Sequence, residues 1–376
     1  MSNCKMWSFL LLFTLFCSSC HGSVTCKNNN GHDVDWYILY KAPEMSSSRL
    51  TGSEFLYIDP EKKERLNNIN SPQGVLARTL QPLFKPIREM EPSFGFISYS
   101  DQPPGCSADP KKFGHSKGVV MVDRTSTGVW LLHSTPQFPF RREQSSFWPQ
   151  SGNKNAQTYI CVTFNYDQFS AIGRHLKKIH IFPFEHYIPN DFHRELQDAV
   201  KWTEGATPVI PDYTVESLTF RRKEFKIFSK ANSEEGEEEV GDLYISIAKN
   251  LRSDVYAQTW GCQRDRTEDY CPREDFKVTN VEELSISSLG AWKPTADHSK
   301  WCVAVDQNKH WTCIADVNRA ISQFKRFGGA LCINDQRVHN EFRAFTRLPT
   351  CRKRPYPLPP ECGSISDDGS LHFLSG

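Results

Sequence analysis

Residues 115–123 read HSKGVVMVD, and residues 298–306 read HSKWCVAVD. Six of the nine positions carry the same residue, and each segment leads from a His-Ser-Lys triplet into an apolar run typical of a β-strand. Each is followed by a short turn and a second apolar run that contains a tryptophan, Trp130 or Trp311. A motif that repeats together with its surroundings indicates an internal repeat. It predicts two similar lobes that face one another.

The two histidines and two lysines of this repeat are the candidate catalytic residues. Residues two apart in a strand point to the same face, so His115 should project with Lys117, and His298 with Lys300. Two imidazoles and two ammonium groups in one cleft suit a phosphodiester, because the lysines neutralise its non-bridging oxygens. One neutral histidine can attack phosphorus and hold it as a phosphohistidine, while the other, protonated, gives its proton to the leaving alkoxide. This chemistry needs no metal, and the sequence shows no HExxH motif, carboxylate cluster or CxxC pair.

Polar residues close the second apolar run of each repeat. His133 ends the first run, and Asn318 follows the second. Either residue could orient the lysines or the phosphate, or simply end its strand, and the sequence does not choose between these interpretations. Asp123 and Asp306 are more typical of turn residues than of catalytic groups.

Composition excludes several classes of protein. The chain has 376 residues, and 45 Lys and Arg against 44 Asp and Glu give a net charge of +1. This balance argues against a protein that binds nucleic acid through the net positive charge of the whole chain, so an anionic partner must bind at a local site. With 38% hydrophobic and 24% charged residues, the chain is neither a membrane bundle nor a disordered protein, and its length permits two lobes.

Residues 1–22 are predicted to be a signal peptide. Lys5 precedes the apolar run WSFLLLFTLFC, and small residues follow up to Gly22. That run is too short to span a bilayer comfortably, and no later apolar stretch approaches about eighteen residues, so we expect no membrane anchor. Cleavage would leave ten of the 13 cysteines, and an even number in an oxidising compartment indicates disulfides.

The repeat predicts a mixed α/β (α+β) fold in which two lobes are related by a pseudo-twofold axis. Each lobe is expected to be a mixed β-sheet flanked by helices. The expected organisation is an N-terminal lobe over 23–205, a C-terminal lobe over 206–351 and a Pro-rich, poorly ordered tail over 352–376. Further expected features are helices over 73–84, 192–202 and 242–251, a linker over 203–213 and an acidic surface loop over 234–242.

Several further segments resemble the deoxyribonuclease II family. The resemblance extends from about residue 24 to about Cys351. The segments that carry it are VDW at 34–36, YKAP at 40–43, YSDQPP at 99–104, GHSKG at 114–118, WLLHS at 130–134, DHSKWC at 297–302 and WTC at 311–313.

The resemblance implies a phospholipase D-like fold, in which two H-x-K lobes share one site. It also implies an acid endonuclease that hydrolyses double-stranded DNA without divalent metal or sequence specificity, leaves 3′-phosphate ends, and works in lysosomes or as a secreted protein. It matches His133 to a histidine of the family's W-L-x-H-S segment. The implied disulfides are Cys26–Cys161, Cys271–Cys351 and Cys313–Cys332, with Cys302 free and Cys106, Cys262 and Cys362 unassigned.

Two other functions compete with the endonuclease. One is another phospholipase D-type phosphodiesterase acting on phospholipids, which a basic amphipathic helix would favour, and none is evident. The other is a catalytically inactive DNA-binding homologue, which the presence of all four motif residues argues against. No cofactor is expected. The sequence leaves open which histidine attacks and whether the chain is a monomer or a homodimer.

Overall fold

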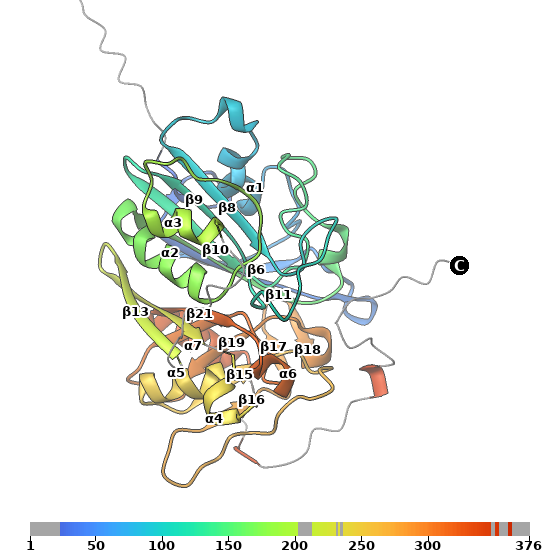
Figure 1. The fold of residues 1–376 in the computed structure, drawn as a ribbon. Helices are drawn as coiled ribbons and strands as arrows, with labels where there is room; N and C mark the ends of the chain where they lie inside the picture. The colour runs from blue at the N-terminus through green and yellow to red at the C-terminus, as the bar shows by residue number, and fades with distance from the viewer. Residues whose placement is uncertain are drawn as a thin grey trace, which may run out of the picture.

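The computed structural model describes residues 23–201, 213–230, 232–233, 236–346, 350–352 and 360–362. The expected signal peptide, the lobe boundary at 205/206 and most of the tail lie outside these ranges. We call the described residues up to 201 the first lobe and those from 213 onward the second lobe (Figure 1).

The first lobe is built on an eight-stranded sheet in which all neighbouring strands are antiparallel. Its strands, in spatial order, are β12 (Pro183–Tyr187), β8 (Phe94–Ser100), β9 (Lys117–Asp123), β10 (Thr127–His133), β11 (Gln157–Asn165), β3 (Trp36–Lys41), β6 (Phe55–Ile58) and β7 (Lys63–Leu66).

The second lobe is built on a seven-stranded sheet that is antiparallel except for the pair β15–β16. Its strands, in spatial order, are β13 (Tyr213–Phe220), β14 (Lys223–Lys230), β21 (Gly328–Asn334), β20 (Trp311–Ala315), β19 (Trp301–Ala304), β15 (Val255–Gln258) and β16 (Val278–Asn280).

Short strands and helices complete the described part of the chain. The helices are α1 (Val75–Leu80), α2 (Phe169–Lys178), α3 (Arg194–Val200), α4 (Glu238–Gly241), α5 (Leu243–Leu251), α6 (Ile321–Phe324) and α7 (Gln336–Ala344). The remaining strands pair as hairpins: β1 (Cys26–Lys27) with β2 (Asp33–Val34), β4 (Glu44–Met45) with β5 (Leu50–Thr51), and β17 (Leu284–Ile286) with β18 (Gly290–Trp292).

The internal repeat extends far beyond the two motifs. The spatial order β8-β9-β10-β11-β3 in the first lobe matches β15-β19-β20-β21-β14 in the second. In both lobes a helix precedes the first of these strands, α1 or α5, and another follows the strand after the motif hairpin, α2 or α7. The expected mixed fold of two similar lobes is therefore confirmed.

Alternating residues of the sheets fill two kinds of core. On β3, Trp36, Ile38 and Tyr40 belong to a large cluster shared by both lobes, whereas Tyr37 and Leu39 face a separate core under α1. The shared cluster takes side chains from α2 and α7 and from both sheets, so the lobes are joined by a continuous apolar core. This period of two is what a sheet covered on both faces requires.

Four helices, α2, α4, α6 and α7, were not predicted from the sequence, whereas helices were correctly expected before β8, near residue 194 and before β15. The expected acidic surface loop is only partly such a loop. Its later residues form α4, and the buried Asp242 caps α5 by accepting a hydrogen bond from the backbone N–H of Tyr244 at 2.8 Å. No helix in the described ranges has the length and apolar character needed to cross a bilayer.

Four disulfides are present, and each lies within one lobe. Three are the pairs that the family resemblance implies: Cys26–Cys161, Cys271–Cys351 and Cys313–Cys332. The fourth joins Cys262 to Cys362, two residues that the family resemblance leaves unassigned. Cys302 is a free, buried thiol and Cys106 is a free, exposed one.

Candidate active site

The backbone of each motif is held by the opposite lobe. The N–H of His115 donates to the carbonyl of Phe327 at 3.0 Å, and the N–H of His298 donates to the carbonyl of Ala156 at 2.9 Å. Phe327 directly precedes β21, and Ala156 directly precedes the equivalent strand β11. The two lobes thus exchange equivalent hydrogen bonds, and this exchange brings both H-x-K motifs to the junction between them.

The charges of the two motifs interact across this junction. Burial lowers the pKa of His298 well below its usual value, and Lys300, Lys117 and His115 lower it further. Burial, aided by Lys117, also lowers the pKa of Lys300 to about 7. The two motifs therefore lie close enough for their charges to act on one another.

Asp101 is the carboxylate at the centre of the first motif. It follows β8, and its two oxygens accept hydrogen bonds from His115 Nδ1 and Lys117 Nζ, each at 2.7 Å. Arg326, from the second lobe, contacts the same carboxylate at 3.2 Å. Burial alone would raise the pKa of Asp101, but His115, Lys117 and Arg326 together hold it well below its usual value. Asp101 is therefore an anion.

This anion sets the tautomer of His115. An ionised carboxylate can only accept hydrogen bonds, so the ring hydrogen of neutral His115 must be on Nδ1. Arg326 Nη1 lies 3.2 Å from that nitrogen but cannot donate to it in this tautomer. Burial lowers the pKa of His115 to about 3, although Asp101 opposes the shift. Neutral His115 therefore keeps the lone pair on Nε2.

His298 has a different neighbour. The ring of Trp260 lies 4.6 Å from the His298 ring, centroid to centroid, at an interplanar angle of 47°. In the first lobe, Gly118 follows the motif lysine and pairs with Tyr99, and Asp101 comes two residues after Tyr99. In the second lobe, Trp301 follows the motif lysine and pairs with Gln258, and Trp260 comes two residues after Gln258. Asp101 and Trp260 therefore occupy equivalent positions. The repeat places a carboxylate beside one histidine and an indole beside the other.

Asp316 is a second buried acid near the lysines. Its Oδ2 accepts a hydrogen bond from the N–H of Gly329 at 2.9 Å, and its Oδ1 has no hydrogen-bond partner among the described residues. Burial raises the pKa of Asp316 to about 8, although Gly329, Lys117 and Lys300 oppose the shift. In acid Asp316 is consequently a neutral carboxyl, and it does not itself offset the positive charge of the lysines.

The two candidate orienting residues occupy different surroundings. His133, at the end of β10, is buried, with its ring centroid 4.9 Å from that of Phe138 and 5.6 Å from that of Tyr159. Burial, and secondly Lys117, lowers its pKa well below the usual value, so it is neutral. Asn318 instead accepts a hydrogen bond from the backbone N–H of Trp260 at 3.2 Å. It thereby holds the backbone of the residue whose indole contacts His298.

Sequence reasoning missed Asp101, Asp316, Arg326 and Trp260 as members of the site. For Asp101 a signal was available, because the end of one strand and the start of its antiparallel neighbour must lie side by side.

The aspartates considered as turn residues behave as such, since Asp123 Oδ1 accepts a hydrogen bond from the N–H of Thr125 at 2.9 Å. Asp306 likewise accepts from the N–H of Asn308, at 2.9 Å.

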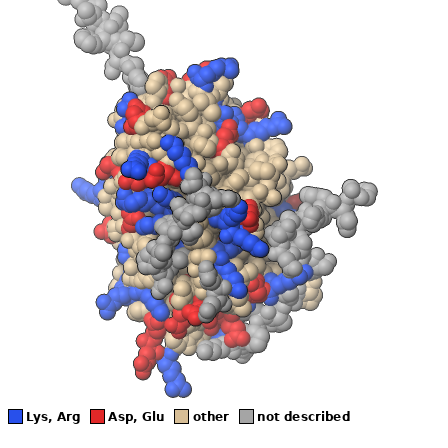
Figure 2. Space-filling view, viewed as in Figure 1, with Lys and Arg blue, Asp and Glu red and all other residues tan. Residues whose placement is uncertain are grey.

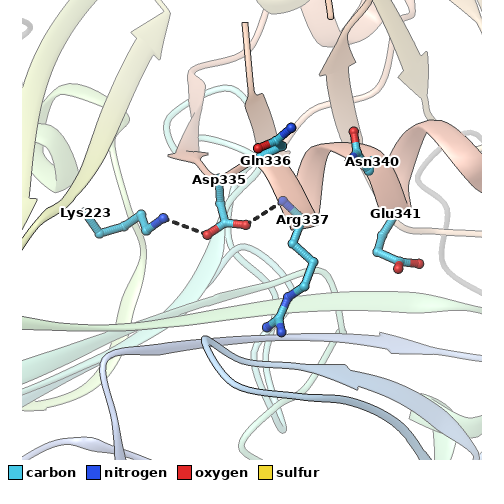
Figure 3. A pocket seen from close by; sticks show the side chains of 6 residues that line it. All are labelled: Lys223, Asp335, Gln336, Arg337, Asn340 and Glu341. Atoms are coloured by element: carbon cyan, nitrogen blue, oxygen red, sulfur yellow. Dashed lines mark hydrogen bonds and ion pairs between the residues drawn. The ribbon is translucent and has the colours of Figure 1, made fainter. Parts of the chain in front are cut away.

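A pocket elsewhere on the surface has no part in this arrangement. Figure 3 shows it beside the start of α7, where Lys223 Nζ contacts Asp335 at 2.6 Å and Asp335 caps the helix. Lys223 begins β14, whose other end lies beside β21 at the motif junction. Seven residues of strand separate the two ends by about 23 Å. The interactions of Asp335 are those of a helix cap.

One described group has the composition of a metal site, namely Asp269, Cys271 and Cys351. The two cysteines are joined in a disulfide, so neither can supply a thiolate ligand.

The junction of the two similar lobes gathers a histidine and a lysine from each, a set of side chains that suits a phosphodiester substrate. A sequence profile of the Deoxyribonuclease II family matches residues 25–351. The chain therefore belongs to the deoxyribonuclease II family, and it is an acid endonuclease that hydrolyses DNA.

Individual relatives cover nearly the whole chain. Human deoxyribonuclease-2-beta is 31% identical over 348 residues, which are 89% of this chain and 94% of that protein. Plancitoxin-1 of Acanthaster planci is 32% identical, covering 91% and 96%, and pig deoxyribonuclease-2-alpha is 33% identical, covering 83% and 86%. Among solved structures, a yeast tyrosyl-DNA phosphodiesterase covers 60% of this chain and 67% of its own at 9% identity, with a TM-score of 0.29, too low to argue from.

Proposed function

We propose that this enzyme cuts DNA without divalent metal through a phosphohistidine on His115, with His298 as the general acid and base. The observation that carries the assignment is the 2.7 Å hydrogen bond between His115 Nδ1 and Asp101. It directs the Nε2 lone pair outward, and the carboxylate stabilises the positive charge that develops on the ring as Nε2 bonds to phosphorus. His298 lies beside an indole, and no carboxylate among the described residues is hydrogen-bonded to its ring.

The reaction then has two displacements. His115 Nε2 attacks phosphorus, the bond from phosphorus to the 5′ oxygen breaks, and His298 gives its proton to that oxygen. A water molecule next attacks the phosphohistidine, His298 takes its proton, and the N–P bond breaks to release a 3′-phosphate end. Lys117 and Lys300 neutralise the non-bridging oxygens as their charge grows.

The same geometry accounts for an acid optimum. His298 must be protonated for the first displacement, yet burial and the motif lysines lower its pKa. A bound phosphodiester offsets the lysines and raises that pKa again, but an acidic solution is still needed to charge the ring. His115 must stay neutral, and its pKa of about 3 ensures that. Activity should therefore be bell-shaped in pH, with its maximum at roughly 4.5–6.

The substrate and the compartment follow from the surface and the cysteines. Figure 2 shows Lys and Arg side chains gathered across the middle of one face, whereas acidic side chains gather at the lower end, where Figure 1 places α4. A polyanion such as double-stranded DNA suits the basic region. Disulfides need an oxidising compartment, which supports delivery through the secretory pathway to lysosomes, or secretion.

The proposal is tested with the purified mature protein and plasmid DNA at pH 5 in excess EDTA. Wild-type protein should cut, and His115→Ala and His298→Ala should each lose about 1,000-fold or more in rate. His186→Ala, an exposed histidine on β12, is the matched control and should cut normally. Loss of cutting in EDTA would exclude metal independence, and an uncut plasmid throughout would favour the inactive homologue.

Two further substrates assign the roles. Thymidine 3′-(p-nitrophenyl phosphate) carries a leaving group that departs without a proton, so His298→Asn should release the first equivalent of p-nitrophenol nearly as fast as wild type, whereas His115→Asn should not. Later turnovers of His298→Asn should be slow, because His298 also takes the proton of the attacking water. Mass spectrometry of quenched enzyme should find phosphate on His115, and a DNA digest should contain 3′-phosphate ends. Phosphate on His298 would reverse the assignment.

A further inference from the structure

Two fully buried lysines outside the H-x-K motifs occupy equivalent positions in the two lobes. Lys41 is the last residue of β3, and Lys230 is the last residue of β14. Lys41 pairs with Gln157, the first residue of β11, and Lys230 pairs with Gly328, the first residue of β21. Each lysine therefore lies beside the start of the strand that receives the opposite lobe's motif.

Each ammonium group is surrounded by three backbone carbonyls. Lys41 Nζ donates to the carbonyls of Ala42 at 2.7 Å, Gly52 at 3.0 Å and Asn153 at 3.0 Å. Lys230 Nζ donates in the same way to carbonyls of one segment of the second lobe. These acceptors are Gln323 at 3.4 Å, Phe324 at 3.2 Å and Arg326.

Burying an ammonium group in the protein interior is unfavourable in free energy. Desolvating an ammonium group costs several kcal/mol, which only well-placed partners offset. An apolar side chain at either position would avoid that cost. The recurrence of the same buried cation at equivalent places indicates that holding these carbonyls has a use.

At each lysine at least one of these carbonyls belongs to the segment that carries a motif contact. Asn153 is three residues before Ala156, whose carbonyl accepts the N–H of His298. Arg326 directly precedes Phe327, whose carbonyl accepts the N–H of His115. Arg326 is anchored twice, because its side chain also contacts Asp101 at 3.2 Å and the carbonyl of Phe113 at 3.2 Å.

We infer that Lys41 and Lys230 are positioning residues that act crosswise: Lys41 of the first lobe places His298 of the second, and Lys230 of the second lobe places His115 of the first. The inference rests on the proposed catalytic roles of these histidines. Neither lysine touches the reacting atoms. Each fixes a short loop whose last carbonyl sets the position of a histidine backbone, and a shift of about 1 Å at such a point can cost about 100-fold in rate.

Protonation strengthens this arrangement in acid. Burial lowers the pKa of both lysines to about 7. Below that pH each is an ammonium with three donors for the surrounding carbonyls, whereas a neutral amine has two donors and a lone pair that carbonyl oxygens repel. The charged groups that act on these lysines are Asp297, Glu54 and Glu44 for Lys41, and Asp242 and Arg326 for Lys230.

The test compares Lys41→Met and Lys230→Met on the two kinds of substrate. On DNA at pH 5 both should lose about 10- to 100-fold in kcat, with little change in KM, because binding groups are untouched. In the first-turnover burst of p-nitrophenol from thymidine 3′-(p-nitrophenyl phosphate), Lys41→Met should stay within about threefold of the wild-type rate, as His298→Asn does, whereas Lys230→Met should lose as much as on DNA.

The control is Lys309→Met. Lys309 also donates to two carbonyls, those of Leu251 at 2.7 Å and Arg252 at 2.8 Å, but it lies in the β19–β20 turn at the far end from Lys300. It should change neither rate. If a methionine variant does not fold, judged by melting temperature and disulfide content, Lys→Arg at the same position replaces it. The larger guanidinium displaces the same loop, so a smaller loss with the same substrate pattern is expected.

The outcomes separate the inference from the function on which it rests. Equal losses on both substrates for both lysine variants, or the reverse pattern, would overturn the crosswise assignment while the histidine variants still behave as proposed. No loss in either lysine variant would show that the lysines only fill space. If His298→Asn itself loses the first-turnover burst of p-nitrophenol, the catalytic roles are wrong instead.

Discussion

Replacing Asp101 by Asn removes the anion from the first motif and keeps the shape of the side chain. Asp101 accepts two hydrogen bonds at 2.7 Å, from His115 Nδ1 and Lys117 Nζ. A hydrogen bond to a charged group contributes about 1.5–3 kcal/mol, so losing the bond that supports the forming phosphohistidine should slow the reaction by about 10- to 150-fold. If the new amide turns its NH₂ toward the ring, His115 takes the wrong tautomer and the loss approaches about 10⁴-fold.

The loss should appear in kcat rather than KM. Without Asp101, Lys117 and Arg326 lose an anionic partner, and the site becomes more positive toward DNA phosphate. Ground-state binding should thus be unchanged or tighter while the chemical step slows. Initial rates on plasmid DNA and on the p-nitrophenyl ester at pH 5 in EDTA measure both constants.

Asp123→Asn is the matched control, because Asp123 bonds the turn at the other end of β9. Its rates should match those of wild type. The melting temperature of each variant checks that the fold is intact. A folded Asp101→Asn enzyme with kcat within about threefold of wild type would refute the role assigned to the carboxylate, and with it the reason for choosing His115 as nucleophile.

Two further predictions concern groups that the sequence did not assign. Asp316→Asn should leave the rate at pH 5 within about threefold of wild type, because the acid is neutral below its pKa of about 8. Initial rates on plasmid DNA at pH 5 measure this, and a loss of about tenfold or more would count against it. Non-reducing peptide mapping should recover Cys262 joined to Cys362, and a free thiol at either residue would contradict the fourth disulfide.

Much of the fold could be predicted because the repeat is strong and local. The strands of the motifs are continuous apolar runs, and β9 and β19 lie within the two repeated segments, while β10 and β20 are the apolar runs that contain Trp130 and Trp311. The helix α2 was missed because its sequence, FSAIGRHLKK, mixes apolar positions with a central glycine that weakens a helix signal. Gly173 is there because the backbone of α3 approaches closely: a Cβ at this position would lie 2.7 Å from the carbonyl carbon of Glu195.

The site could be predicted only where its residues are neighbours in sequence. The motif histidines and lysines can be recognised by their spacing. Arg326, in contrast, contacts Asp101 from 225 positions away and lies in no recognisable motif. Asp316 lies two residues from Asn318, yet burial rather than residue type makes it the acid with an altered pKa. Burial and contacts across lobes depend on the folded chain, so a pattern along the sequence does not contain them.

The hydrogen bonds exchanged between His115 and Phe327 and between His298 and Ala156 have the form of an isologous interface, in which each half offers the other the same patch. In a true homodimer every side chain beside one histidine would also stand beside its symmetry mate. Here both halves belong to one polypeptide, so the equivalent positions can hold Asp101 and Trp260. Because the halves are covalently linked, the two imidazoles need not have identical environments. A difference of one residue on each side is enough to give the two histidines permanently different properties.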